Sequence, residues 1–304
     1  MKVSVITVNF NQPAVTEELL ASIPLTDTEL EIIVVDNGSE KDNTPQWQIK
    51  YPTVRFIRSD KNLGFAGGNN LGIKAAAGEY LFLVNNDTEF TPGLVDKLAD
   101  VLNEHPDAGM VSPMIKYFSD KNIIQYAGYT PISYYTCRNT CIGLREKDTG
   151  QYDNIASPTA YCHGAAMMIK KEAIDKAGLM NEDFFLYYEE VDWCEHIKRA
   201  GYEAWVCTSA VIYHKESVSV GKKSKLKEYF MNRNRMLFIR RNAPLFKQLI
   251  FYPYFILLVV PRNIVEYIKD KNYEFIPMLL KAVWWNIVNT KNSKNLGYPI
   301  NNIS

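Results

Sequence analysis

The sequence predicts an α/β fold in which helices flank a mostly parallel sheet and a helical extension follows. Two observations support this prediction. Short apolar runs rich in β-branched residues alternate with helical patterns in the first third of the chain, which is typical of βαβ units. From residue 222 onward strand-like runs stop, and cationic, apolar and aromatic residues on helical material take their place.

The first part of the chain predicts four strands and three helices in alternation. Tyr80–Val84 is the clearest strand, because it is apolar throughout, as a parallel strand buried on both faces must be. Proline is tolerated in a first turn, so Pro13 begins a helix. The other expected strands are Lys2–Asn9, Leu30–Asp36 and Val54–Arg58, and the expected helices are Pro13–Ile23, Gly67–Ala76 (entered through a glycine-rich turn) and Pro92–Glu104.

The second part of the chain begins with a weakly patterned segment, from about Lys116 to Thr159, which we expect to form loops and short strands over the edge of the sheet. Regular patterns then return, and Phe184–Tyr188 is aromatic enough to pack into the core. In order, we expect a strand at Ala160–Ile169, a helix at Lys171–Ala177 capped by Gly178, a helix from Glu189 to Gly201, and strands at Ala204–Val206 and Ala210–Tyr213.

The C-terminal segment, 221–304, is basic and aromatic. Its apolar run Leu249–Pro261 is shorter than the roughly 20 residues that span a bilayer, and Pro253 is expected to interrupt it. One interpretation is a set of amphipathic helices on an anionic membrane surface; the other is a helical cap packed on the α/β core with solvated lysines. Its cations are Lys222, Lys223, Lys225, Lys227, Arg233, Arg235, Arg240 and Arg241.

Composition narrows the class of protein. The formal net charge of +0 provides no overall field toward nucleic acid, so we expect no nucleic-acid partner. Five cysteines without a CxxC pair argue against a disulfide framework and favour a reducing cytosol. The first residues already form a strand, so we expect no signal peptide. A metal cluster of Cys137, Cys141 and Cys162 is a weak alternative without a second motif to support it.

Polar side chains that could bind a ligand or act in catalysis lie at the ends of three predicted elements. Asn85-Asn86-Asp87 ends the Tyr80–Val84 strand, where a carboxylate can hold a divalent metal against a phosphate, or where the three residues simply form a turn. Glu189 and Glu190 begin a helix, which favours acids through its dipole; alternatively, they line a cleft and one is a base. His214 at a strand end is either structural or a ligand.

Five stretches, in order and with these spacings, resemble the family 2 glycosyltransferases. They are VSVITVNFN at Val3–Asn11, IVVDNGS at Ile33–Ser39, NLGFAGGNNLG at Asn62–Gly72, the Asn-Asn-Asp tip, and Gly164–Gly201 with FFLYYEEVDW inside it. The combination most resembles the rhamnosyltransferase-like branch. The resemblance covers about Met1 to Arg241.

The resemblance implies a Rossmann-like GT-A fold and transfer of a sugar from a nucleotide diphosphate, with inversion at the anomeric carbon. It implies a GT-A catalytic domain at 1–220, with a nucleotide-sugar half at about 1–115 and an acceptor half at about 116–220. Glu190 falls at the position of the catalytic carboxylate. The implied nucleotide-sugar residues are Thr7, Asn9, Asp36 (to the imide N–H of the base), Asn62, Gly64 and Asn86, and the implied ligands of Mg²⁺ or Mn²⁺ are Asp87 and His214.

The chain departs from the family pattern at three places. Asparagines precede the one aspartate of the metal motif, so we expect a weaker metal site. Glutamate replaces the commoner aspartate at position 190, which leaves Glu189 as a competitor for the role of base. His163 stands where a small or apolar residue is usual, and we expect it near the acceptor or donor sugar.

The implied donor is dTDP-rhamnose or a UDP-hexose, since both bases present the same imide edge. The implied acceptor is a saccharide or lipid-linked saccharide in cell-surface polysaccharide synthesis, and the implied location is cytoplasmic, on the inner face of the plasma membrane if the C-terminal segment binds lipid. A catalytically degenerate nucleotide-sugar-binding protein is the first alternative. A sugar-nucleotide pyrophosphorylase is less well supported, because the loop Asn9–Gln12 after the first strand has no cation.

Overall fold

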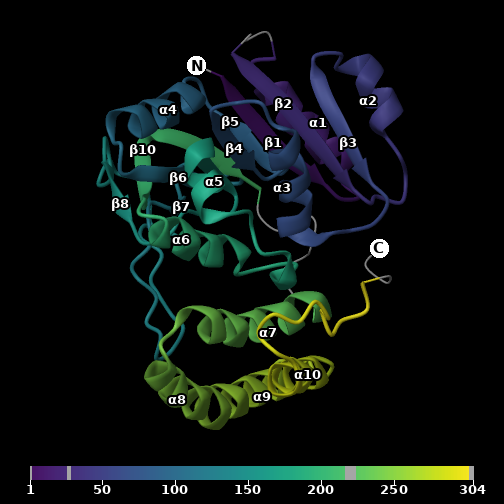
Figure 1. The fold of residues 1–304 in the computed structure, drawn as a ribbon, viewed down its shortest axis with the longest axis vertical. Coiled ribbons are helices and arrows are strands. Elements are labelled where there is room, and N and C mark those ends of the chain that lie inside the picture. The colour runs from purple at the N-terminus through teal and green to yellow at the C-terminus, as the bar shows by residue number, and fades with distance from the viewer. Residues whose placement is uncertain (1, 26–28, 216–223, 301–304) are drawn as a thin grey trace.

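The computed structural model describes residues 2–25, 29–215 and 224–300. These residues form one central sheet of ten strands with helices on both faces and a stack of helices below it (Figure 1). Its main path runs β3-β2-β1-β4-β9-β6-β10-β5, with β7 on β6 and β8 on β10. The strands are β1 (Val3–Asn9), β2 (Leu30–Asn37), β3 (Val54–Ser59), β4 (Tyr80–Val84), β5 (Thr88–Phe90), β6 (Ala108–Tyr117), β7 (Ile124–Tyr126), β8 (Ala156–Thr159), β9 (Ala166–Lys170) and β10 (Glu203–His214).

The sheet is mostly parallel, as predicted. β3, β2, β1 and β4 are parallel neighbours, as are β6 and β10, whereas β9 lies antiparallel between β4 and β6. The register places Asn9 beside Asp36, so the polar ends of β1 and β2 meet at one edge. Ligands of open α/β sheets bind beyond such carboxyl ends.

Alternate residues of the central strands enter two separate cores, because successive side chains of a strand point to opposite faces. Ile32 and Val34 belong to one core and Ile33 and Val35 to the other, and all four are buried. The first core is completed by α1 (Pro13–Ser22), α2 (Thr44–Lys50) and α4 (Leu94–Glu104), and the second by α3 (Gly64–Ala75), α5 (Lys171–Ala177) and α6 (Glu189–Arg199).

Several predicted boundaries are wrong for identifiable reasons. Helix α3 begins at Gly64 rather than at Gly67. Gly64 has a positive φ of 74°, a conformation that glycine adopts readily. A Cβ on Gly64 would lie 2.2 Å from the carbonyl oxygen of Phe185, so only glycine fits this close contact. β9 begins only at Ala166, after a turn that includes His163, and the two strands expected near His214 form one irregular strand, β10.

The strands β5 and β6 and the helix α2 were not predicted at all. β6 follows α4 and is buried over most of its length, and short α2 packs Trp47 against Phe56 of β3. The weakly patterned segment does contain short strands at the sheet edge, β7 and β8.

The C-terminal helices form two layers (Figure 1). α7 (Lys225–Asn242) lies between the sheet-bearing part and an outer layer made of α8 (Leu245–Tyr254), the π-helical turn η2 (Phe255–Val259), α9 (Val260–Lys269) and α10 (Phe275–Val288). Arg233 of α7 is fully buried, with its guanidinium 3.9 Å from the centre of the Trp285 ring. Arg233 therefore belongs to the packing between α7 and α10 and is not a solvated cation. Lys222 and Lys223 lie outside the described residues.

The apolar outer helix is longer than the sequence suggested. Pro253 does not end it, because the chain continues through the wider turns of η2 into α9. Within the resulting run, Leu245–Lys269, a window of 18 residues has a mean hydropathy of 1.4, and by length and composition alone the run would permit a membrane span. One side of it is nevertheless packed against the protein through Phe251, Phe255 and Val259.

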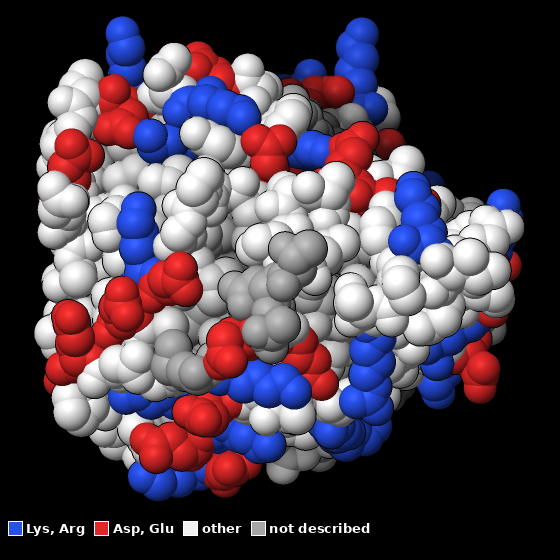
Figure 2. Space-filling model, turned by 90° about the horizontal axis from the view of Figure 1, so that it is seen from above, with Lys and Arg blue, Asp and Glu red and all other residues white. Residues whose placement is uncertain are grey.

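Charges are mixed over the face seen in Figure 2, where Lys and Arg lie among Asp and Glu. This pattern agrees with the balanced composition of 34 cationic and 34 anionic residues.

Candidate active site

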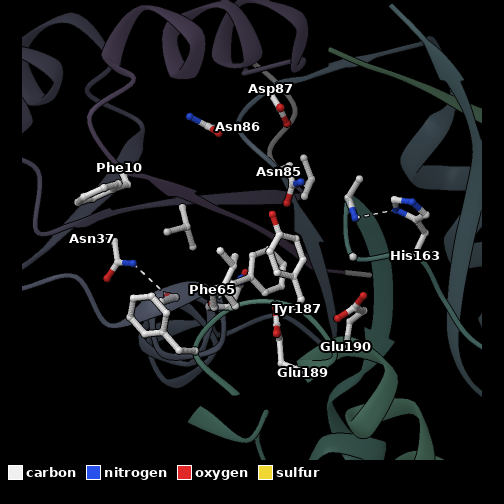
Figure 3. Close-up of a pocket in the computed structure, with 18 of the residues that line it drawn as sticks. Phe10, Asn37, Phe65, Asn85, Asn86, Asp87, His163, Tyr187, Glu189 and Glu190 are labelled. Atoms are coloured by element: carbon white, nitrogen blue, oxygen red, sulfur yellow. Dashed lines mark hydrogen bonds between the residues drawn. The ribbon is translucent and has the colours of Figure 1, made fainter. Parts of the chain in front are cut away.

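A cavity of about 420 Å³ lies at the carboxyl ends of β1, β2 and β4. Loops after these strands form one side, and the segment leading into α6 forms the other (Figure 3). Asn86 and Asp87 lie across the cavity from Glu189 and Glu190 (Figure 3). The two groups of acids that the sequence singled out therefore share one space.

Asp87 is held beside His214 by strand pairing. Asp87 immediately precedes β5, which pairs antiparallel with β10 and sets Thr88 opposite His214. The Nε2 atom of His214 lies 3.2 Å from Oδ1 of Asp87, and both residues are buried. Oδ1 of Asp87 has no hydrogen-bond partner among the described residues.

Gln125 fixes the orientation of the His214 ring. The Oε1 atom of Gln125 lies 2.8 Å from Nδ1 of His214, so Nδ1 carries the proton and donates it to the amide oxygen. Nε2 then presents a lone pair toward the Asp87 carboxylate. In a neutral ring this places two acceptors 3.2 Å apart, which repel unless a cation lies near both, so Asp87 and neutral His214 fit a divalent metal ion. Among the described residues, no three His, Cys, Asp or Glu side chains cluster as a closed metal site.

Glu189 and Glu190 differ in their titration. Burial raises the pKa of Glu189 well above its usual range, and the neighbouring charge of Glu190 adds to this effect. Burial also raises the pKa of Glu190, but backbone hydrogen bonds around the start of α6 oppose the shift. Burial therefore raises the pKa of both carboxyls.

Asn234 of α7 holds the segment that precedes these acids. Its Nδ2 donates to the carbonyl oxygens of Phe184, Leu186 and Tyr187, each at 2.8 Å. The segment needs this support because Phe185, Tyr187 and Tyr188 all have positive φ angles of 64–74°. Buried Asn234 thus links the C-terminal helices to the position of Glu190.

His163 lines the cavity as an uncharged ring. Its Nδ1 accepts a hydrogen bond from the backbone N–H of Ala165 at 3.1 Å, which leaves the proton on Nε2. Burial, with a contribution from His214, lowers the pKa of His163 to about 3, so the ring is neutral at physiological pH.

The residues assigned to the nucleotide sugar separate into two groups. Asn62, Gly64 and Asn86 line the cavity. Thr7, Asn9 and Asp36 are fully buried behind it. The Oγ1 of Thr7 has no hydrogen-bond partner among the described residues, whereas Asp36 accepts from Asn9 at 2.8 Å and pairs with Arg58.

A chain of hydrogen bonds connects the two groups. Asn9 accepts from the Thr16 hydroxyl at 2.9 Å, and Asn86 donates to that hydroxyl at 3.1 Å. Asn37, directly after Asp36, lines the cavity and donates to the carbonyl oxygen of Gly64 at 3.0 Å. The ends of β1, β2 and β4 are therefore held together by polar contacts.

The lining residues that sequence reasoning missed include Phe10, Asn37, Gln125 and Lys227. Asn37 and Phe10 adjoin predicted residues and were detectable from their place at strand ends. Gln125 lies in the weakly patterned segment, where no signal pointed to it. Among the described residues, Lys227 is the one Lys or Arg whose side chain lines the cavity. In the sequence it was noted only as one of the cations of the C-terminal segment.

A mostly parallel sheet with a cavity at its carboxyl edge is the architecture of the GT-A fold. The chain belongs to glycosyl transferase family 2, whose model matches residues 4–178.

Curated relatives and solved structures agree with this assignment. The chain is 27% identical over 240 residues (72% of this chain, 77% of the relative) to an N-acetylglucosaminyl-diphospho-decaprenol L-rhamnosyltransferase of Mycobacterium tuberculosis. It is 27% identical over 280 residues (90% and 87%) to the low-salt glycan biosynthesis hexosyltransferase Agl10 of Haloferax volcanii. It is 22% identical over 258 residues (78% and 82%) to the dTDP-rhamnosyl transferase RfbF of Shigella flexneri.

Two solved structures share the fold. S. aureus TarS 1-349 in complex with UDP-GlcNAc has a TM-score of 0.61 at 18% identity, over 94% of this chain and 81% of that chain. The mannosyltransferase PcManGT of Pyrobaculum calidifontis, in complex with GDP-Man and Mn²⁺, has a TM-score of 0.54 at 17% identity, over 95% and 76%.

Proposed function

We propose that the protein is a metal-dependent inverting glycosyltransferase that moves a sugar from a nucleotide diphosphate to a saccharide or lipid-linked saccharide. The observation that carries this proposal is the placement of Asp87 with His214 and of Glu190 on opposite sides of one cavity (Figure 3). The catalytic domain is assigned to 1–220, with a nucleotide-sugar half at 1–115 and an acceptor half at 116–220. The helical extension is 221–304.

Asp87 and His214 would hold Mg²⁺ or Mn²⁺, with oxygens of the diphosphate and water completing the shell. The fit rests on the unpartnered Oδ1 of Asp87 and the lone pair of His214 Nε2 that faces it. A bound metal would supply charge stabilisation for the leaving diphosphate. The solved fold neighbour that contains Mn²⁺ supports the choice of a divalent ion.

Glu190 is the proposed general base. Its charged carboxylate accepts the proton of the acceptor hydroxyl as that oxygen attacks the anomeric carbon, and the bond to the diphosphate breaks on the opposite face. Such a base contributes about 10²–10⁴-fold to the rate. Glu189, whose pKa is also raised by burial, is the competing candidate for this role. His163 is proposed to donate through Nε2 to a sugar hydroxyl.

The nucleotide is proposed to bind along Asn37, Asn62, Gly64 and Asn86. Thr7, Asn9 and Asp36 complete the pocket from behind, with Asp36 as the proposed partner of the base imide. The support for Asn9 and Asp36 is the hydrogen-bond chain that joins them to Asn86, and the support for Thr7 is its buried Oγ1, which has no partner among the described residues. The names of the relatives and of the UDP-GlcNAc complex favour dTDP-rhamnose or a UDP-hexose as the donor.

The proposed acceptor pathway is cell-surface polysaccharide synthesis at the cytoplasmic face of a membrane. Its support is the lipid-linked substrate in the name of the mycobacterial relative, and the exposed apolar side chains of the outer helices. These side chains, which include Leu249, Leu257, Leu258 and Trp284, suit the interfacial region of a bilayer.

The deciding experiment is a panel of nucleotide sugars with and without Mn²⁺. A preferred donor at a hundredfold excess over Kd should stabilise the protein by about 2.7 kcal/mol, and the panel should show hydrolysis or transfer of that donor in the presence of Mn²⁺. Turnover that is independent of metal, or stabilisation by nucleoside triphosphates with release of pyrophosphate, contradicts the proposal.

A further inference from the structure

A second cavity, of about 540 Å³, lies between the catalytic cavity and the outer helices. Its walls are the loop at Cys137–Asn139, helix α7 and helix α9. Lys227 lines both cavities, and Tyr188, which lines the second, directly precedes the two acids of the first. The two cavities are therefore neighbours along α7.

The side chains that line the second cavity are suited to a polyhydroxylated ligand. They combine amides, carboxylates and aromatic faces, which together offer donors, acceptors and stacking surfaces for sugar hydroxyls and sugar rings. The main examples are Asn139, Asn232, Asn263, Glu266, Tyr188 and Tyr267.

Arg235 provides an independent sign of a ligand. One of its Nη atoms donates to the carbonyl oxygen of Thr136, but its buried Nε has no hydrogen-bond partner among the described residues. A buried donor without a partner costs about 1–3 kcal/mol, which a ligand oxygen would offset.

Helix α9 separates this polar cavity from the apolar outer surface. Asn263, Glu266 and Tyr267 line the cavity, whereas Val265 and Ile268 of the same helix are exposed. The exposed apolar surface continues onto η2 through Leu257 and Leu258, which are 69% and 62% exposed. A polar head and an apolar tail of one molecule would thus find matching surfaces on either side of α9.

We propose that the second cavity binds the saccharide of a lipid-linked acceptor, while the lipid lies on the apolar surface of η2 and α9. The acceptor hydroxyl then reaches Glu190 past Lys227. This inference rests on the proposed function, because it assigns the acceptor site of the same reaction.

The first test changes the rim of the second cavity. Asn139→Ala and Asn263→Ala each remove hydrogen-bonding groups, and roughly a tenfold rise in acceptor KM is expected for each. The donor KM and the hydrolysis of donor without acceptor should stay unchanged. Asn122→Ala, at an exposed position before β7, is the matched control. The probe is N-acetylglucosaminyl diphosphate linked to a short polyprenol, and its binding is also measured directly by calorimetry.

The second test separates head from tail. Leu257→Asp with Leu258→Asp should raise the KM for the polyprenol-linked probe at least tenfold, but leave the KM for the same saccharide on a hexyl group unchanged. Ile49→Asp, on α2 and 85% exposed, is the control. Absence of probe binding by the wild-type protein, or equal binding by the rim variants, overturns the inference. If the wild-type protein binds no nucleotide-sugar donor, the proposed function is refuted instead.

Discussion

The imidazole of His214 faces the carboxylate of Asp87 at 3.2 Å, although the two residues are far apart in the sequence. The β5–β10 ladder brings them together, and Gln125 turns the ring so that its lone pair points at the acid. This arrangement is the basis for the proposal that Asp87 and His214 hold a divalent metal ion together with a diphosphate.

Replacement of Gln125 should weaken metal binding without touching a ligand. In Gln125→Leu the His214 ring loses the acceptor that fixes its tautomer, and a fall of about 10–100-fold in Mn²⁺ affinity is expected. Titration of the protein with Mn²⁺ and UDP, followed by electron paramagnetic resonance, measures this change. Asn103→Leu, remote on α4, serves as the control. An unchanged Mn²⁺ affinity would remove Gln125 from the site.

Glu190→Gln is expected to bind nucleotide sugar normally and to lose at least ~100-fold in turnover, since it removes the proton acceptor. Glu189→Gln should retain most of the activity, because a protonated carboxyl and an amide have nearly the same shape and neither carries charge. Initial rates at saturating donor and acceptor give both values. A severe loss in Glu189→Gln together with a mild one in Glu190→Gln would exchange the two roles.

The pH dependence of stability gives a separate test of Glu189. Its pKa is raised in the fold, so the folded protein retains a proton that the unfolded chain releases. The free energy of unfolding then falls by about 1.4 kcal/mol per pH unit from the ordinary carboxyl pKa up to the raised one. Glu189→Gln has no titrating carboxyl at this position. Its free energy of unfolding should therefore increase relative to that of the wild-type protein as the pH rises. Urea unfolding at several pH values measures it, with exposed Glu104→Gln as the control.

Asn234 is expected to be important both for stability and for catalysis. Asn234→Ala leaves the carbonyl oxygens of Phe184, Leu186 and Tyr187 without this donor, at a cost of about 1–3 kcal/mol in the free energy of unfolding. Asn234→Asp should cost more, since a carboxylate would face three acceptors. In Asn234→Ala, kcat should fall more than donor affinity, because the segment before Glu190 loosens. Equal stability of all three proteins would contradict this role.

The apolar outer surface predicts association with membranes. The protein should float with liposomes at low salt, and Leu249→Asp with Trp284→Asp should reduce flotation because both side chains are exposed. Liposomes with and without anionic lipid separate apolar insertion from charge attraction. The Ile49→Asp variant should float as the wild-type protein does; recovery of all proteins in the soluble fraction would refute the proposal.

The sequence was sufficient for the features that depend on local pattern. Tyr80–Val84 and Lys171–Ala177 were predicted with their observed boundaries, since burial and helical period are explicit in their residues. The candidate residues Asp87, His214 and Glu190 were found through family motifs and do line one cavity. The sequence did not indicate features that depend on contacts between distant residues. Strand β6 was missed because Pro113 lies within its apolar run. Gln125 was missed because its role comes only from the tertiary contact with His214.

The sequence also did not indicate that helix α7 lies between the sheet-bearing part and the outer helices. Its cations left two interpretations open, a membrane-facing surface and a helical cap with solvated lysines. Neither indicated that Arg233 donates to the carbonyl oxygen of Asp183 and stacks on Trp285. Burial lowers the pKa of Arg233 to about 10, but the group stays charged at neutral pH. Only the three-dimensional packing shows that this helix is an interior support.

The position of α7 between the sheet-bearing part and the outer helices limits how far the chain can be shortened from its C-terminus. Asn286 of α10 donates to the backbone of Arg233, the neighbour of the residue that clamps the segment before the acids. Trimming the protein after Asn242 would strip the outer wall from α7 and expose Phe238 and Met236, which that wall helps to bury. The C-terminal helices therefore support the segment that carries Glu190, and we expect a chain shortened after Asn242 to lose the geometry of the cavity.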